Sequence, residues 1–208
     1  MAVVQQGSFD FTLMYLTHGA FRRDLERLAG AVAAGKAHTG GTLAGWKNFK
    51  SQLDVHHSVE DAALWPRVVS AVHGRSDALA LMGEMEAEHA SLHPHVDTVE
   101  DGLVHGAADL GHRVRDLAAL LDRHMRHEEE SALPLIQEVL TLRDWSAFRG
   151  AMARRQGVKG AAMYVPWVLD GLGEEDKHRF MTDMGRRVQV ANKVIFQRNY
   201  DKRHLWGR

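Results

Sequence analysis

Two short segments of the chain carry the same arrangement of histidine, glutamate and proline. The first reads HHSVEDAALWP and begins at His56; the second reads HMRHEEESALP and begins at His124, 68 residues later. In each copy a glutamate follows the first histidine by four positions and a proline follows it by ten; these residues are Glu60, Pro66, Glu128 and Pro134. Imidazole nitrogens and carboxylate oxygens bind iron, manganese and zinc. The repeat therefore predicts a metal site.

A single histidine precedes each copy. His18 lies 38 residues before His56, and His89 lies 35 residues before His124. One buried histidine is more often a hydrogen-bonded core residue than a ligand, and a single HxxxE pattern also occurs on solvated helices. Four histidines and two glutamates in a doubled arrangement are harder to explain by packing, so we interpret them as one shared metal centre.

The segments around these residues have the periodicity of helices. Apolar residues recur at spacings of three, four and seven around each of the four histidines, which directs each imidazole toward the core. Breaks rich in glycine separate four predicted helices, at residues 8–35, 42–65, 77–104 and 108–132. No segment has the sustained two-residue alternation of a strand. The predicted fold is all-α, an up-down-up-down antiparallel four-helix bundle with additional short C-terminal helices.

The spacing also predicts that the ligands share one depth in the bundle. The midpoint of His18 and His56 is residue 37, and that of His89 and His124 is 106–107, so both midpoints lie in predicted turns. Residues four apart on a helix share one face, with Cβ atoms about 6 Å apart. An ionised glutamate in an apolar core costs several kcal/mol unless it is paired or bound to a metal. The two glutamates are therefore predicted to bridge two cations.

Composition excludes other kinds of site. The 208 residues include 14 histidines and no cysteine, so a disulfide, an iron–sulfur cluster or a thiolate zinc site is excluded. The N-terminus lacks the pattern of a signal peptide, and no apolar stretch is long enough to cross a bilayer, so we expect a cytoplasmic protein with no membrane partner. The C-terminal third is basic, which can indicate nucleic-acid binding. We expect it instead to dock on its own acidic bundle, with no nucleic acid.

The motifs resemble those of the hemerythrin-like proteins, in particular the bacterial group with the signature H…HxxxE…H…HxxxE. The resemblance covers about residues 8–140 and includes the acidic pairs Glu60-Asp61 and Glu128-Glu129 and the prolines that follow. It implies a non-haem di-iron centre with an oxo or hydroxo bridge. In that centre Glu60 and Glu128 bridge, and the terminal ligands are His18, His56, His89 and His124. Ligand type alone suits manganese or zinc as well as two Fe ions.

One departure from the oxygen-carrying hemerythrins leaves open whether His93 and Glu129 are ligands. Those proteins resemble this chain in having HxxxH on the third helix, here His89 and His93, which makes His93 a further candidate ligand. Their fourth-helix carboxylate follows its histidine by five residues, the position of Glu129 here. His93 precedes Pro94, where helical geometry is strained. His57 and His127 adjoin the ligand positions and are expected to be rotated away from the metals, either behind the ligands or at the surface.

The resemblance divides the chain into a bundle at 1–142 and a helical extension at 143–208. Similar extensions appear on hemerythrin-like proteins of actinobacteria. The segment from 144 predicts three or four short helices, which would cover one end of the bundle, form a dimer contact or screen the metal site. The oligomeric state is not predicted by the sequence.

Three functions are compatible with the predicted centre. The first is a binding or sensing protein for a small molecule, O2, NO or H2O2, because a histidine-rich centre favours small diatomics or peroxide over activation of strong C–H bonds. The second is a peroxidase or catalase-like di-iron enzyme. The third is an interaction protein in which the metal is structural. The sequence indicates no catalytic residues distinct from the metal ligands.

Overall fold

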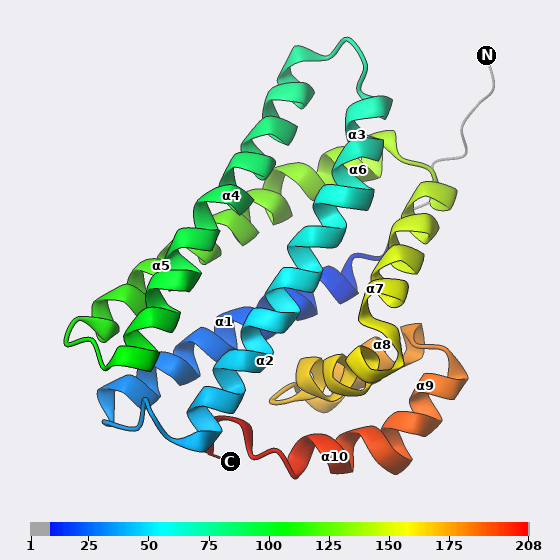
Figure 1. Cartoon of the computed structure of the whole chain (residues 1–208). Coiled ribbons are helices and arrows are strands. Elements are labelled where there is room, and N and C mark those ends of the chain that lie inside the picture. The colour runs from blue at the N-terminus through cyan, green and yellow to red at the C-terminus, as the bar shows by residue number, and fades with distance from the viewer. Residues whose placement is uncertain (1–8, 208) are drawn as a thin grey trace.

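The computed structural model describes residues 9–207, in which an antiparallel four-helix bundle forms the larger part (Figure 1). Its long helices are α1 (Thr12–Ala33), α2 (Gly40–Val59), α4 (Ser76–His105) and α5 (Leu110–His127). Consecutive helices run in opposite directions, and α1 contacts both α2 and α5, which closes the bundle. The predicted up-down-up-down fold is confirmed. Ser8, the expected start of the first helix, lies outside the described residues.

The turns between the paired helices explain where the helices end. Gly35 follows α1 and Gly106 follows α4, both with positive φ (68° and 73°), a conformation that glycine adopts without a steric penalty. Thr39 caps α2, its side chain accepting a hydrogen bond from the backbone N–H of Thr42. These turns place the paired histidines at one level, as the midpoints predict.

Each HxxxE helix passes into a π-helical turn at its glutamate. Glu60 begins η1 (Glu60–Leu64), and Glu128 begins η2 (Glu128–Ala132). In both turns the residue before the proline donates its backbone N–H to the carbonyl of the glutamate, five positions back. Proline has no N–H and its ring crowds the carbonyl four positions earlier, so a wider turn accommodates it.

The helices continue beyond the prolines, and the expected helix ends at 65 and 132 were wrong. Helix α3 (Trp65–Ala71) follows η1, and α6 (Leu133–Val139) follows η2. The proline occupies the second position of each new helix, where a missing N–H breaks no hydrogen bond within that helix.

A band of polar side chains divides the apolar core of the bundle into two parts. One part lies toward the α1–α2 and α4–α5 turns and includes Phe21, Leu53, Leu92 and Leu121. The other lies toward the opposite end and includes Met14, Val59, Met85 and Ala132. On α1, α2 and α4 a candidate ligand histidine lies between residues of the two parts, and on α5 His124 precedes η2, which contributes Ala132 to the second part.

The C-terminal segment forms further helices against the bundle. They are α7 (Leu142–Leu169), α8 (Glu174–Asp183), α9 (Arg186–Ala191), η3 (Asn192–Phe196), α10 (Gln197–Asp201) and η4 (Leu205–Gly207). Helix α7 is longer than the short helices that the sequence predicts, and it breaks at Gly157, where φ is 60°. Helix α7 begins at Leu142 and so crosses the predicted boundary between residues 142 and 143. The division into two domains stays a prediction. Within residues 9–207, none of the helices is both long and apolar enough to cross a membrane.

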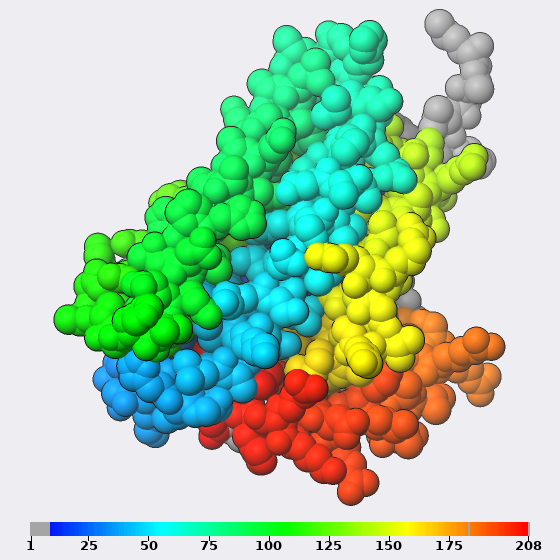
Figure 2. Space-filling view, in the orientation of Figure 1, coloured from blue at the N-terminus to red at the C-terminus, as the bar shows by residue number. Residues whose placement is uncertain are grey.

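Contacts to α1 and α2 hold this segment in place. Arg27 pairs with Asp170 (Nη1–Oδ2 2.6 Å), and the Trp167 indole N–H donates to buried Asp24 (2.8 Å). At its far end, η4 packs on α2, and Figure 2 shows the last described residues (red) lying against the beginning of α2 (light blue).

Candidate metal centre

The six candidate ligands lie together in the polar band of the bundle. Each of the four long helices contributes one histidine, and each π-helical turn contributes its first glutamate; they are His18, His56, His89, His124, Glu60 and Glu128. All six are buried, with no more than 3% of any residue exposed. The fold therefore brings the repeated motifs to one point.

The histidines form two pairs, one from each helical hairpin. His18 Nε2 lies 3.2 Å from His56 Nε2, and His89 Nε2 lies 3.0 Å from His124 Nε2. Two nitrogen ligands about 2.1 Å from one metal and at right angles to each other are about 3 Å apart. The spacing within each pair thus fits a shared cation.

The two glutamates lie among these nitrogens. Glu128 Oε2 is 3.2 Å from His18 Nε2. Glu60 reaches both hairpins, with Oε1 3.2 Å from His56 Nε2 and Oε2 3.7 Å from His89 Nε2. That is the position of a carboxylate that would bridge two cations.

Both carboxylates are buried without the hydrogen bonds that normally accompany burial. Neither oxygen of Glu60 or of Glu128 has a hydrogen-bond partner among the described residues. A buried charge that lacks such partners is expensive, and bound cations are one of the few ways to compensate it. The donor set, the spacing and these four oxygens therefore fit a pair of metal ions.

The pKa values show how the centre is charged without metal. Burial, with the nearby Glu128, raises the pKa of Glu60 well above 4.5. Burial would also raise the pKa of Glu128, but the adjacent His18 imidazole holds it at about 2. Burial lowers the pKa of His56 and of His124. In the metal-free centre, burial therefore favours the neutral forms of His56, His124 and Glu60, and a cation bound by Glu60 would displace its proton.

Carboxylates outside the centre orient three of the four imidazoles. Each imidazole donates its Nδ1–H to one carboxylate, which directs Nε2 to the centre. The pairs are His18 with Glu129 (2.8 Å), His89 with Asp61 (2.7 Å) and His124 with Glu88 (2.8 Å). Such partners fix ring orientation and strengthen metal ligands. His56 Nδ1 is buried without a partner among the described residues.

In each acidic pair, the first carboxylate thus lies inside the centre and the second lies behind a histidine. Glu129 lies behind His18 and also accepts from Arg22 (Nη1–Oε1 2.9 Å), whereas Glu128 lies inside the centre. The sequence leaves open whether Glu128 or Glu129 is the fourth-helix carboxylate of the centre. An oxygen of Glu128 faces the Nε2 atom of His18.

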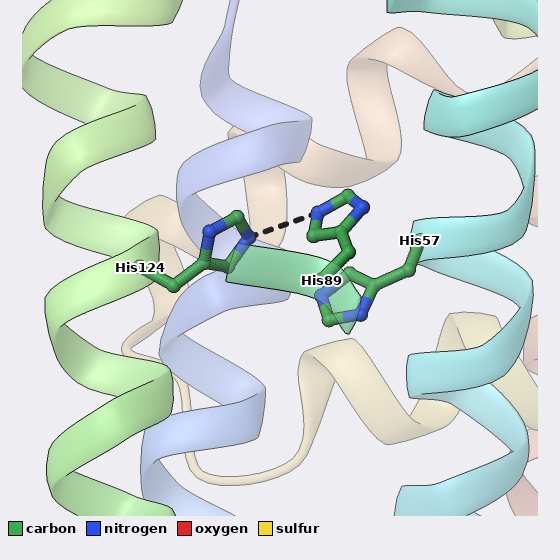
Figure 3. A group of neighbouring side chains, drawn as sticks. All are labelled: His57, His89 and His124. Carbon is green, nitrogen blue, oxygen red and sulfur yellow. Dashed lines mark hydrogen bonds between the residues drawn. The ribbon is translucent and has the colours of Figure 1, made fainter. Parts of the chain in front are cut away.

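His57 was expected to be rotated away from the ligand positions, either behind the ligands or at the surface, and the surface position was wrong. It is only 5% exposed, and its ring stacks on that of His89 with centroids 4.0 Å apart (Figure 3). The apolar spacing could have indicated this, because His57 follows buried Leu53 by four residues and Phe49 by eight.

Donor atoms close enough to share an ion form two groups within residues 9–207. In each group the donors lie within 4.8 Å of one another; one group is His18, His56 and Glu128, and the other is His57, His89 and His124. His93 belongs to neither, since its side chain is on the exposed face of α4. His127 is half-buried and pairs with Glu88 (Nδ1–Oε1 2.8 Å), behind His124.

A cavity of about 470 Å³ borders the centre at His56. Helices α1 and α7 supply most of its walls, and its lining includes Leu13, Met14, Trp145, Met152 and Val165. Thr17 and Tyr164 also line it, and their hydroxyl groups are hydrogen-bonded to each other (Oγ1–Oη 2.7 Å). No pattern in the sequence indicated this cavity, because its walls come from segments more than 80 residues apart.

Comparison with known proteins identifies the family. The chain has no match among the curated proteins or the solved structures that were compared with it. Residues 10–136 match the model of the hemerythrin HHE cation-binding domain, a span that contains all six candidate ligands and more than half of the chain. The chain therefore belongs to the hemerythrin HHE cation-binding family and is a metal-binding protein.

Proposed function

We propose that this protein holds two iron ions at the centre and binds or senses a small diatomic or oxidant there, namely O2, NO or H2O2. One observation carries the proposal, the convergence of four imidazoles on two buried carboxylates that lack hydrogen-bond partners. Iron is part of the proposal, since the same donors would suit manganese or zinc.

The residues have distinct roles in this proposal. The terminal ligands are the four histidines at 18, 56, 89 and 124, and the bridging ligands are Glu60 and Glu128, because Glu60 contacts histidines of both hairpins. When bound, the iron pair supplies redox chemistry and an open coordination position. The protein holds the ligands rigid through the carboxylates behind three of the imidazoles, and its apolar core excludes bulk water.

The cavity supports a small neutral ligand. It reaches His56, and most of its lining is apolar, so it would admit O2 or NO more readily than an ion. Helix α7 forms one wall, which gives the C-terminal extension a part in the reaction with the ligand.

Peroxide turnover is the second candidate, and the hydroxyl pair in the cavity favours it. Tyr164 and Thr17 provide hydrogen-bonding groups in a mainly apolar cavity, and Thr17 directly precedes His18. A peroxidase or catalase-like reaction needs groups that donate and accept protons beside the metal.

The experiment compares binding with turnover in the metal-loaded, full-length protein. The reduced protein is exposed to NO and to O2 while its visible spectrum is recorded, and H2O2 consumption is measured separately. A reversible spectral change without sustained consumption supports binding or sensing, whereas sustained consumption supports the enzyme. Whichever is observed, the spectral change or the H2O2 consumption, should disappear in Glu60→Ala. If metal-loaded protein shows neither, the metal is structural and the proposal is wrong.

A further inference from the structure

We infer that His57 supplies a fifth imidazole to the centre, so that the two metal positions have different ligand sets. The inference rests on the proposed pair of metals and adds a ligand outside the repeated motif. It starts from the internal repeat, which makes the two hairpins nearly equivalent and so makes each difference between them informative.

Two differences between the hairpins fall at the centre. The 68-residue shift that relates His56 to His124 relates His57 to Met125, and both of these are buried. The residue before His89 is Glu88, which bonds His124 Nδ1, whereas the residue before His18 is Thr17, which bonds Tyr164. One hairpin therefore has an extra imidazole, and the other has an extra carboxylate behind its ligands.

The position of His57 is that of a ligand for the second metal. Three helices, α2, α4 and α5, bring His57, His89 and His124 together, as Figure 3 shows. His57 lies edge to face with His124 (ring centroids 5.3 Å apart), and each of the three rings offers a nitrogen within 4.8 Å of the others.

A packing role alone explains His57 poorly. Its Nε2 is buried and has no hydrogen-bond partner among the described residues, although a buried polar atom without a partner costs about 1–3 kcal/mol. The equivalent position of the other hairpin is filled by methionine, which needs no such partner.

The two ligand sets would then differ in a way that matters for a small molecule. One metal would have three imidazoles, from His57, His89 and His124, and the other would have two, from His18 and His56, with Glu128 beside them. The metal with fewer imidazoles is the one beside the cavity, since His56 is part of the cavity lining. The open coordination position would therefore face the cavity.

The test titrates the metal-free, full-length protein with Co²⁺ and measures stoichiometry and affinity by calorimetry and absorption. The variant is His57→Met, which copies the residue of the second hairpin. We expect wild type to bind about two ions, and the variant to keep one site while the other weakens by roughly 10- to 100-fold. His93→Gln, which alters the competing candidate, should bind as wild type does.

The outcomes separate this inference from the proposed function. If wild type binds fewer than two ions, the proposed metal pair fails. If wild type binds two and His57→Met binds both with unchanged affinity, or if His93→Gln weakens the second site instead, only the role of His57 is wrong. If a variant does not fold, a second measurement on wild type still tests the inference. Mössbauer spectra of the iron-loaded protein should show two inequivalent iron sites, and a single site would contradict the inference.

Discussion

Glu60 and Glu128 occupy core positions where apolar side chains would stabilise the fold. Their four oxygens are buried without hydrogen-bond partners, and the two groups are close enough to repel each other when ionised. Glu128 is compensated by His18, which holds its pKa at about 2, whereas burial raises the pKa of Glu60. Glu60 therefore lowers the stability of the metal-free protein at pH values where it would ionise in the unfolded chain, and residues that cost stability in this way are expected at functional positions.

Replacing Glu60 by glutamine should stabilise the metal-free protein as pH rises. Burial raises the pKa of Glu60, so the folded state binds this proton more tightly than the unfolded state does. The stability from that proton is complete at pH values below 4.5 and is lost as pH rises toward the folded pKa. The advantage of Glu60→Gln over wild type should increase by about 1–3 kcal/mol between pH 5 and pH 8.

Urea unfolding of the metal-free proteins at both pH values measures this effect. The matched control is Glu130→Gln, which changes an exposed glutamate of the same turn and should show no such trend. An advantage that is constant with pH would show that Glu60 is ionised in the folded state throughout this range.

Spacing along the helices was enough to identify the six candidate ligands. It did not identify His57, because the HxxxE repeat directed attention to residues shared by both hairpins, and His57 is present in only one. The bond of Glu129 to His18 was also not predictable, since it depends on how α1 and η2 face each other.

At the scale of the elements, the two π-helical turns are the feature that the sequence did not predict. A proline after a helical pattern usually ends or kinks a helix, and the sequence does not show that one extra residue lets the helix continue. Each turn begins at a ligand glutamate and places the next acidic residue behind a histidine of the other hairpin. The four long helices were predictable, because their apolar stripes are local and their turns contain glycine.

The packing of η4 on α2 depends on two glycines of that helix, Gly41 and Gly45. A Cβ at Gly45 would overlap the indole of Trp206, with Cε3 only 2.8 Å away. Trp206 has φ of 64°, a strained conformation for a bulky residue, which its packing on this helix must offset.

Gly45→Ala should therefore destabilise the protein, by about 1–3 kcal/mol, as overpacked core substitutions do. Thermal unfolding measures the loss, and tryptophan fluorescence should report movement of the indole. Gly30→Ala is the matched control in α1, where an added Cβ meets nothing within 4 Å. That change should stabilise by about 0.5–1 kcal/mol. Equal effects of the two substitutions would mean that η4 does not pack on Gly45.

At the scale of the molecule, the bundle and the C-terminal helices together form the cavity beside the centre. Helix α7 contributes Trp145, Met152 and Val165, and α1 contributes Met14 and Thr17. The sequence could not predict this arrangement, because α7 lacks a clear apolar stripe and breaks at Gly157. The extension thus forms part of the wall of the cavity beside the candidate metal centre.

Filling the cavity should slow the entry of ligands without removing metal. Ala161→Phe places a ring in the cavity, so stopped-flow measurements of NO binding to the reduced protein should give a lower association rate with unchanged metal content. Val158→Phe is the control, because Val158 is 82% exposed on the same helix. Binding at the wild-type rate in Ala161→Phe would place the entry route elsewhere.

We propose that the bundle core holds a pair of metal ions between its two hairpins. The iron content and visible spectrum of the full-length protein, after anaerobic loading with Fe²⁺ and removal of unbound metal, test this proposal. We expect about two iron ions per chain and an absorption band that changes when the protein is oxidised and reduced. Folded protein that keeps less than one ion per chain, or that binds iron equally well after Glu60→Ala and Glu128→Ala together, would contradict it.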